Sequence, residues 1–143
     1  MRDLVKNTTK TAVFALGGLG EVGKNMYCIE HGESIIIIDS GVMFGDEYLP
    51  GVDYVLPDYS YLIENQEKVK ALIITHGHED HIGGIPFLLK SITLPCIYAP
   101  KLAAAFIRNK LEEHKFERKC RIVEIDENSN FKVDCFLFSF FST

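Results

Sequence analysis

Residues Ala71–Leu89, ALIITHGHEDHIGGIPFLL, constrain what this chain can fold into more than any other stretch. The stretch opens with an apolar, β-branched run, Leu72–Thr75, which predicts a buried strand. It continues to Ile82–Leu89, where two glycines and a proline suit the first turn of a short helix. Between the strand and the helix lie four side chains of the types that bind metal ions: His76, His78, Asp80 and His81.

The spacing of these side chains suits two metal ions. His76 and His78 are two residues apart in an extended segment, so both imidazoles can project to one side. Asp80 and His81 are adjacent where the chain turns toward the helix, and they can face a second point nearby. Imidazole with carboxylate favours zinc. Glu79 is expected to face away. A solvated polar loop is the alternative, but a motif that follows a strand and opens a helix favours metal binding.

Composition limits the class of protein. A chain of 143 residues with 47% hydrophobic and 24% charged residues predicts one soluble domain, at residues 11–143, after a flexible tail at residues 1–10. The polar start lacks the apolar region of a secretion signal, and no run is long enough to cross a membrane, so we expect a cytoplasmic protein. A net charge of −5 argues mildly against nucleic-acid binding by overall positive charge, although bound metals would add positive charge locally.

Three strands are predicted before the metal motif, at Thr11–Leu16, Met26–Glu30 and Ser34–Asp39. The glycine-rich run at residues 17–23, GGLGEVG, matches the G-x-G-x-x-G pattern of dinucleotide-binding folds. That interpretation needs a helix of about ten residues between two parallel strands. Only Lys24–Ser34 is available, and it reads as a strand followed by a turn, so an antiparallel meander is favoured.

Two residues after the meander are candidates for supporting roles. Asp39 ends a run of four isoleucines, and a carboxylate at a buried strand end needs partners. It could accept hydrogen bonds from the metal loop or cap a turn, and the residues alone leave both open. Phe44 could stack on a nucleotide base or fill the underside of its own loop.

The C-terminal half is predicted to hold a strand at Cys96–Ala99, a helix from Lys101 to about His114, and a strand at Cys120–Ile125. The expected apolar face of the helix consists of Leu102, Ala105, Phe106 and Leu111. Lys132–Phe141 is intensely hydrophobic and is expected to be one final strand.

The run at residues 76–81, HGHEDH, resembles the H-x-H-x-D-H signature of the metallo-β-lactamase superfamily. The resemblance implies an α/β fold (α+β by layer), the N-terminal part of an αββα sandwich with a mixed, largely antiparallel sheet and flanking helices. Ile35–Ser40, IIIIDS, is similar to the superfamily's first motif, whose aspartate supports the metal loop. That match implies the supporting role for Asp39.

Longer stretches resemble the ribonuclease J family, namely residues 15–26, 49–58, 75–86, 98–102 and 110–114. The resemblance implies a two-zinc ribonuclease of the β-CASP branch that cuts RNA internally and digests it from the 5′ end. Such enzymes act in mRNA turnover and rRNA maturation as homodimers or homotetramers, with further partners in RNA degradation. It also implies that His76 and His78 bind the first zinc ion, and that Asp80 and His81 bind the second and act in catalysis.

The chain departs from the family pattern. Later motifs of the family supply another histidine, expected just past the last strand, then a bridging aspartate and a further histidine, and the chain does not supply them. The CASP insertion, the 5′-phosphate pocket and the C-terminal oligomerisation region of the family are absent too. We therefore expect the N-terminal part of a longer protein, with partial metal occupancy and no activity alone. Two metal ions would activate a water to attack the phosphodiester. The rival interpretations are a hydrolase of the same fold acting on a small ester or thioester, and a non-catalytic assembly module.

Overall fold

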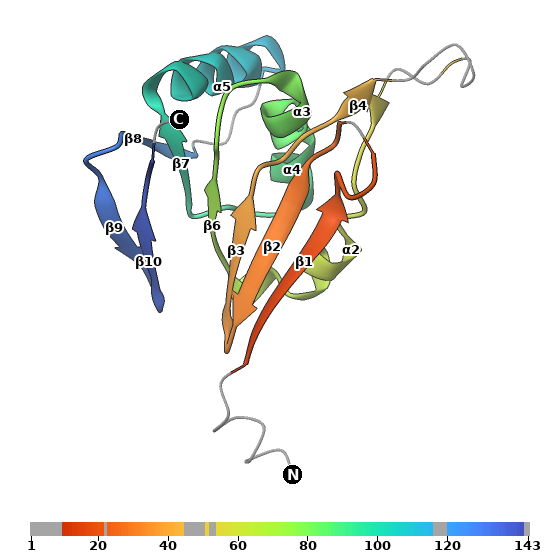
Figure 1. Cartoon of the computed structure of the whole chain (residues 1–143). Helices are drawn as coiled ribbons and strands as arrows, with labels where there is room; N and C mark the ends of the chain where they lie inside the picture. The colour runs from red at the N-terminus through yellow and green to blue at the C-terminus, as the bar shows by residue number, and fades with distance from the viewer. Residues whose placement is uncertain (1–9, 22, 45–50, 52–53, 116–119, 142–143) are drawn as a thin grey trace.

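A computed structural model of the chain describes residues 10–21, 23–44, 51, 54–115 and 120–141 (Figure 1). Its main feature is a six-stranded sheet in the order β1-β2-β3-β6-β7-β8. The strands of this sheet are β1 (Thr11–Gly17), β2 (Met26–His31), β3 (Ser34–Ile38), β6 (Val69–Ile73), β7 (Cys96–Pro100) and β8 (Arg121–Ile125). The helices are α2 (Ser60–Glu64), the 3-10 helix η1 (Gln66–Lys68), α3 (Glu79–Ile82), α4 (Ile85–Ser91) and α5 (Lys101–Glu113). Two small antiparallel pairs join β4 (Met43–Phe44) to β5 (Tyr54–Val55), and β9 (Asn130–Val133) to β10 (Phe136–Ser139).

The main sheet is mixed, as predicted, but it is not largely antiparallel, because three of its five described pairings are parallel. β1, β2 and β3 form the expected antiparallel meander, which excludes the dinucleotide-binding interpretation of the glycine-rich run. From β3 onward the pairings to β6, β7 and β8 are parallel, with connections that pass through helices. The antiparallel pairs therefore lie in the N-terminal half of this sheet and in the two small hairpins.

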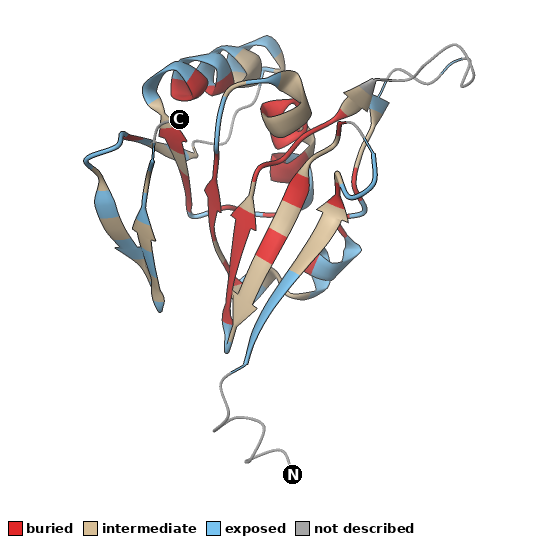
Figure 2. Ribbon diagram, viewed as in Figure 1, coloured by how far each residue is buried: buried red, intermediate tan, exposed pale blue. Residues whose placement is uncertain are grey.

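Both faces of the sheet are apolar, and different elements cover them. Side chains alternate along a strand, so Ile35 and Ile37 of β3 face one way, whereas Ile36 and Ile38 face the other. The first pair packs with buried side chains from α2, α3, α4 and α5, in the larger core cluster. The second pair packs with the aromatic side chains of β9 and β10. Burial is most continuous in the central strands (Figure 2).

The α5 helix packs on the sheet through a different face from the one predicted. Ala103, Ala104 and Ile107 are buried, whereas Leu102 is 68% and Phe106 47% exposed. The small alanines let the helix backbone approach β7 and β8 closely. The close packing gained in this way is more favourable than burial of the larger side chains of Leu102 and Phe106 would be. Among the helices of the described residues, none is both long and apolar enough to span a membrane.

Two further predictions of single elements are wrong. The expected helix at Ile82–Leu89 is two short helices, α3 and α4, with Gly83 and Gly84 between them and Pro86 in the first turn of α4. The expected strand at Lys132–Phe141 is the β9–β10 hairpin. Asp134 takes a left-handed φ of 53° there, which reverses the chain within an apolar run.

Candidate metal centre

The predicted metal loop lies at the edge of the sheet where β3 and β6 end. These strands are parallel, so their carboxyl ends meet at one edge, which is the usual place for a site in such sheets. Asp39 follows β3, and its backbone N–H bonds the carbonyl of Ile73 at 2.9 Å. Thr75 and His76 follow β6, and the chain then enters α3 (Figure 1).

Asp39 is the central acceptor of this edge. The residue is 3% exposed, and its Oδ1 accepts the backbone N–H of Thr75 at 2.8 Å. Its Oδ2 accepts the Thr75 hydroxyl at 2.7 Å and lies 2.7 Å from Nδ1 of His81. Of the two roles left open by the sequence, the bonds of the Asp39 carboxylate match the support of the metal loop, because they go to Thr75 and His81. These bonds offset the cost of burying the carboxylate.

Hydrogen bonds to Asp39 orient two imidazoles. An ionised carboxylate only accepts, so Nδ1 of His81 carries the proton and Nε2 is left with a free lone pair. The Thr75 hydroxyl already donates to Asp39, so the 3.0 Å contact between its oxygen and Nδ1 of His76 has the imidazole as donor. His76 and His81 therefore both present Nε2, which is the arrangement that a carboxylate produces behind a metal-binding histidine.

The three imidazoles of the loop lie together. The ring of His76 is 3.9 Å from the ring of His81 and 4.7 Å from that of His78, between centroids. Burial lowers the pKa of His76, and the nearby imidazoles of His81 and His78 lower it further. A lowered pKa keeps an imidazole neutral, which is the form that binds metal.

Asp80 lies beside the imidazoles, with its Oδ2 3.5 Å from Nε2 of His81. The structure thus brings all four predicted ligands into one short stretch at the sheet edge. Within the described ranges, no three His, Cys, Asp or Glu side chains are arranged closely enough to enclose a metal ion. The donor chemistry and the orientation of His76 and His81 nevertheless fit a divalent metal ion such as zinc. The Phe44 side chain, predicted as a possible RNA contact, lies outside the described residues.

Two further residues lie at the metal loop and were not predicted from the sequence: Asn25 bonds the loop, and Gly41 bonds Asn25 and lies close to Asp80. The Asn25 backbone N–H and side-chain amide both bond the Asp80 carbonyl, each at 3.0 Å. The Gly41 N–H bonds the Asn25 carbonyl at 2.9 Å, and a Cβ on Gly41 would overlap the Asp80 carbonyl oxygen. Only a glycine fits at that point. The position of Asn25 in the sequence could have indicated this role. Asn25 directly precedes β2, and because β2 is antiparallel to β3, the start of β2 lies at the sheet edge where β3 ends.

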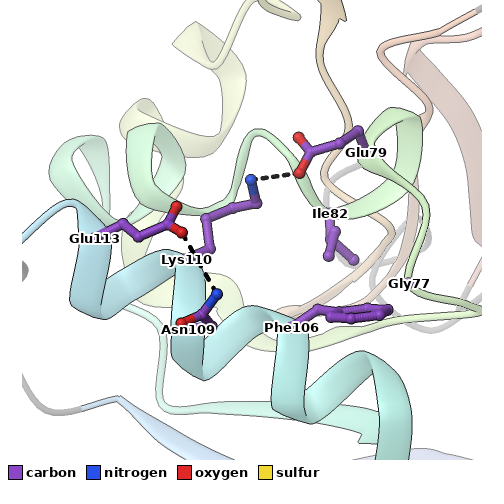
Figure 3. A pocket seen from close by; sticks show the side chains of 7 residues that line it. All are labelled: Gly77, Glu79, Ile82, Phe106, Asn109, Lys110 and Glu113. Atoms are coloured by element: carbon purple, nitrogen blue, oxygen red, sulfur yellow. Dashed lines mark hydrogen bonds and ion pairs between the residues drawn. The ribbon is translucent and has the colours of Figure 1, made fainter.

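The opposite side of the metal loop faces α5 across a cavity of about 270 Å³ (Figure 3). Glu79 points away from the imidazoles, as predicted, and forms an ion pair with Lys110 of α5. Phe106 lies against Gly77, where a Cβ would come within 2.8 Å of the aromatic ring. The remaining lining residues are Ile82, Asn109 and Glu113.

Comparison with known proteins defines the class. Residues 19–132 match the family model of the metallo-beta-lactamase superfamily. The chain therefore belongs to this superfamily, and membership implies metal ions at the site. The fold agrees: the metallo-beta-lactamase fold protein YhfI from Bacillus subtilis superposes with a TM-score of 0.57 at 17% sequence identity. That alignment covers 91% of this chain and 51% of YhfI.

Particular relatives are much closer in sequence. The chain is 52% identical to ribonuclease J 1 of Streptococcus pyogenes over 143 residues. This alignment covers 100% of the chain and 25% of that protein. Over 133 residues it is 53% identical to ribonuclease J of Mycoplasma pneumoniae, covering 93% of this chain and 23% of that protein. The predicted resemblance to ribonuclease J is confirmed. The chain spans about a quarter of the length of these curated relatives.

Proposed function

We propose that this chain forms the metal-binding part of a ribonuclease that hydrolyses phosphodiester bonds of RNA. The observation that carries the proposal is the hydrogen-bond relay from Asp39, which leaves Nε2 of both His76 and His81 free for metal. Identity of 52% to a protein named ribonuclease J 1 supports RNA as the substrate. Relatives and geometry thus favour the same chemistry.

The metal in this proposal is zinc, with His76 and His78 holding one ion and Asp80 and His81 holding the second. Paired divalent ions supply an activated water nucleophile and neutralise charge on phosphate oxygens. The chain's own contribution is orientation: Asp39 and Thr75 fix the imidazoles before metal arrives, which lowers the cost of forming the site. Asp80 and His81 would stand closest to the reacting phosphate.

The proposal extends to the wider role expected from the ribonuclease J resemblance. It comprises internal cleavage, digestion from the 5′ end, a role in mRNA turnover and rRNA maturation, and a homodimer or homotetramer. Four ligands do not complete two catalytic zinc sites, each of which uses about three protein ligands. We therefore propose that the 143-residue chain alone binds zinc weakly and does not cleave RNA.

The test uses the polypeptide with its natural termini and two labelled RNAs, one circular and one linear with a 5′-monophosphate. The proposal expects cleavage of both, and loss of both with His78→Ala. His78 precedes α3 without a side-chain capping bond, so the variant should keep its circular dichroism spectrum and melting temperature. His31→Ala is the matched control, because this histidine is distant in the sequence and its side chain bonds Thr11 and packs against Phe136.

Undiminished RNA cleavage by a folded His78→Ala variant would overturn the proposal. Hydrolysis of a small thioester without RNA cleavage would support the rival hydrolase. Zinc binding with neither reaction would support an assembly module.

A further inference from the structure

The glycine-rich run and Asn25, two residues after it, have a place in the structure that the proposed function does not use. Asn25 directly precedes β2. Because β2 runs opposite to β3 and β6, its first residue reaches the edge at which those two strands end. Asn25 thus meets the metal loop from a segment some 50 residues earlier in the sequence.

The Asn25 side chain contacts both halves of the Asp80–His81 pair. Its Nδ2 lies 3.0 Å from the Asp80 carbonyl oxygen and 3.3 Å from the Asp80 carboxylate oxygen Oδ2. The same nitrogen lies 3.4 Å from Nε2 of His81. Asp39 bonds the other nitrogen of that ring, so the imidazole is held from both sides.

We propose that Asn25 is a positioning residue of the metal centre, whose amide orients the Asp80 carboxylate and, in the metal-free protein, favours the His81 tautomer with an unprotonated Nε2. A bound metal ion would replace this long 3.4 Å contact at Nε2, while the bonds to Asp80 would remain. An amide N–H can donate to Nε2 only when Nε2 carries no proton, which is the tautomer that the Asp39 bond also requires. The inference rests on the proposed metal site.

The chemistry of an amide suits this position better than other polar side chains. A lysine or arginine here would pair with Asp80 and compete with a metal cation. An aspartate would place a second carboxylate about 3.3 Å from the first and lacks the N–H donors. A neutral group with two N–H donors holds the carboxylate while leaving its charge for the metal.

The glycine-rich run fits around this side chain. Gly18 has a φ of 88°, and a Cβ there would come within 2.5 Å of the Asn25 side-chain oxygen. Gly18 of the run therefore leaves room for Asn25 where a larger residue would not. That gives this glycine a role in the proposed site.

The test compares Asn25→Ala with the wild type in the polypeptide with its natural termini. Two quantities are measured without RNA: the ¹⁵N shifts of the His81 ring in metal-free protein, and the Zn²⁺ affinity by competition with a chromophoric chelator. The proposal expects a shift of His81 toward the Nε2–H tautomer and an affinity lower by about 10- to 100-fold. Asn65→Ala, which removes an exposed amide bond to Tyr61, should change neither.

A purely structural role for Asn25 gives a different result, because the backbone bonds to Asp80 and Gly41 survive the alanine substitution. A lower melting temperature with an unchanged tautomer and unchanged Zn²⁺ affinity would overturn the inference. If Asn25→Ala does not fold, Asn25→Ser is measured instead, since its hydroxyl is too short to reach His81. Failure of both variants to fold would also assign the side chain to structure alone and reject the proposal.

This experiment is separable from the proposed function. Wild-type protein that binds Zn²⁺ but leaves RNA intact would contradict the ribonuclease, while the Asn25 comparison would still be decided. Wild-type protein that binds no Zn²⁺ would contradict both.

Discussion

The two sides of the metal loop are held by different kinds of contact. On the sheet side, the buried Asp39 carboxylate and several backbone hydrogen bonds hold the loop, at distances of 2.7 to 3.4 Å. On the α5 side, the described contacts are the Glu79–Lys110 ion pair and the packing of Phe106 on Gly77, beside a cavity. Buried bonds have no water to replace a lost partner, whereas water reaches the Glu79 side chain, which is 43% exposed, although Lys110 is 17% exposed. The sheet side should therefore set the geometry of the ligands, and the α5 side should adjust it.

Gly41→Ala should give the largest effect of any single change at the loop. The new Cβ would overlap the Asp80 carbonyl oxygen and approach the backbone nitrogen of Asn25, and backbone atoms cannot turn aside. We expect a loss of about 3 kcal/mol or more in unfolding free energy, measured by urea denaturation. Gly20→Ala is the matched control, because nothing lies within 4 Å of a Cβ at that position.

The control does carry a strain of its own. Gly20 has a φ of 70°, so the alanine should cost about 1 kcal/mol there. An equal loss at Gly41 and Gly20 would mean that the close approach to Asp80 contributes nothing, and the comparison between the two sides would lose its main support.

Thr75→Val should have an intermediate effect, and mainly on the ligands. The substitution keeps the shape of the side chain but breaks the bond to Asp39 and the contact with Nδ1 of His76. We expect a loss of about 1–3 kcal/mol and a Zn²⁺ affinity lower by about tenfold or more. Chemical denaturation and chelator competition measure the two.

Thr11→Val is the matched control for this variant, since the Thr11 hydroxyl also bonds a histidine, His31, at 2.7 Å but on an exposed strand. It should leave Zn²⁺ affinity unchanged. A Thr75→Val variant with wild-type affinity would show that His76 does not need the relay from Asp39.

The relay also shows what the sequence could and could not predict. The strand meander and the ligand cluster were predictable, because alternation of apolar residues and the H-x-H-x-D-H spacing are local patterns. The partners Asn25 and Thr75 were not identified as part of the site, because their role depends on which strand ends meet at one edge. The buried face of α5 was predicted wrongly, since side-chain size does not reveal that alanines allow the closest packing. The hairpin at the C-terminal end was missed because one left-handed residue, Asp134, interrupts an otherwise apolar run.

Lys110→Met should have the smallest effect, and it tests the α5 side directly. Methionine keeps most of the apolar stem of the side chain while removing the charge that pairs with Glu79, whose side chain is 43% exposed. We expect a change below about 1 kcal/mol that shrinks further at high salt, and a Zn²⁺ affinity within about twofold of the wild type. A double-mutant cycle with Glu79→Gln isolates the pair from other effects of each substitution.

A loss of unfolding free energy as large as that of Gly41→Ala, or a tenfold change in Zn²⁺ affinity, would mean that α5 fixes the ligands as firmly as the sheet does. The distinction between the two sides would then be wrong, and the cavity between Glu79 and Phe106 would have to be counted as part of the metal centre.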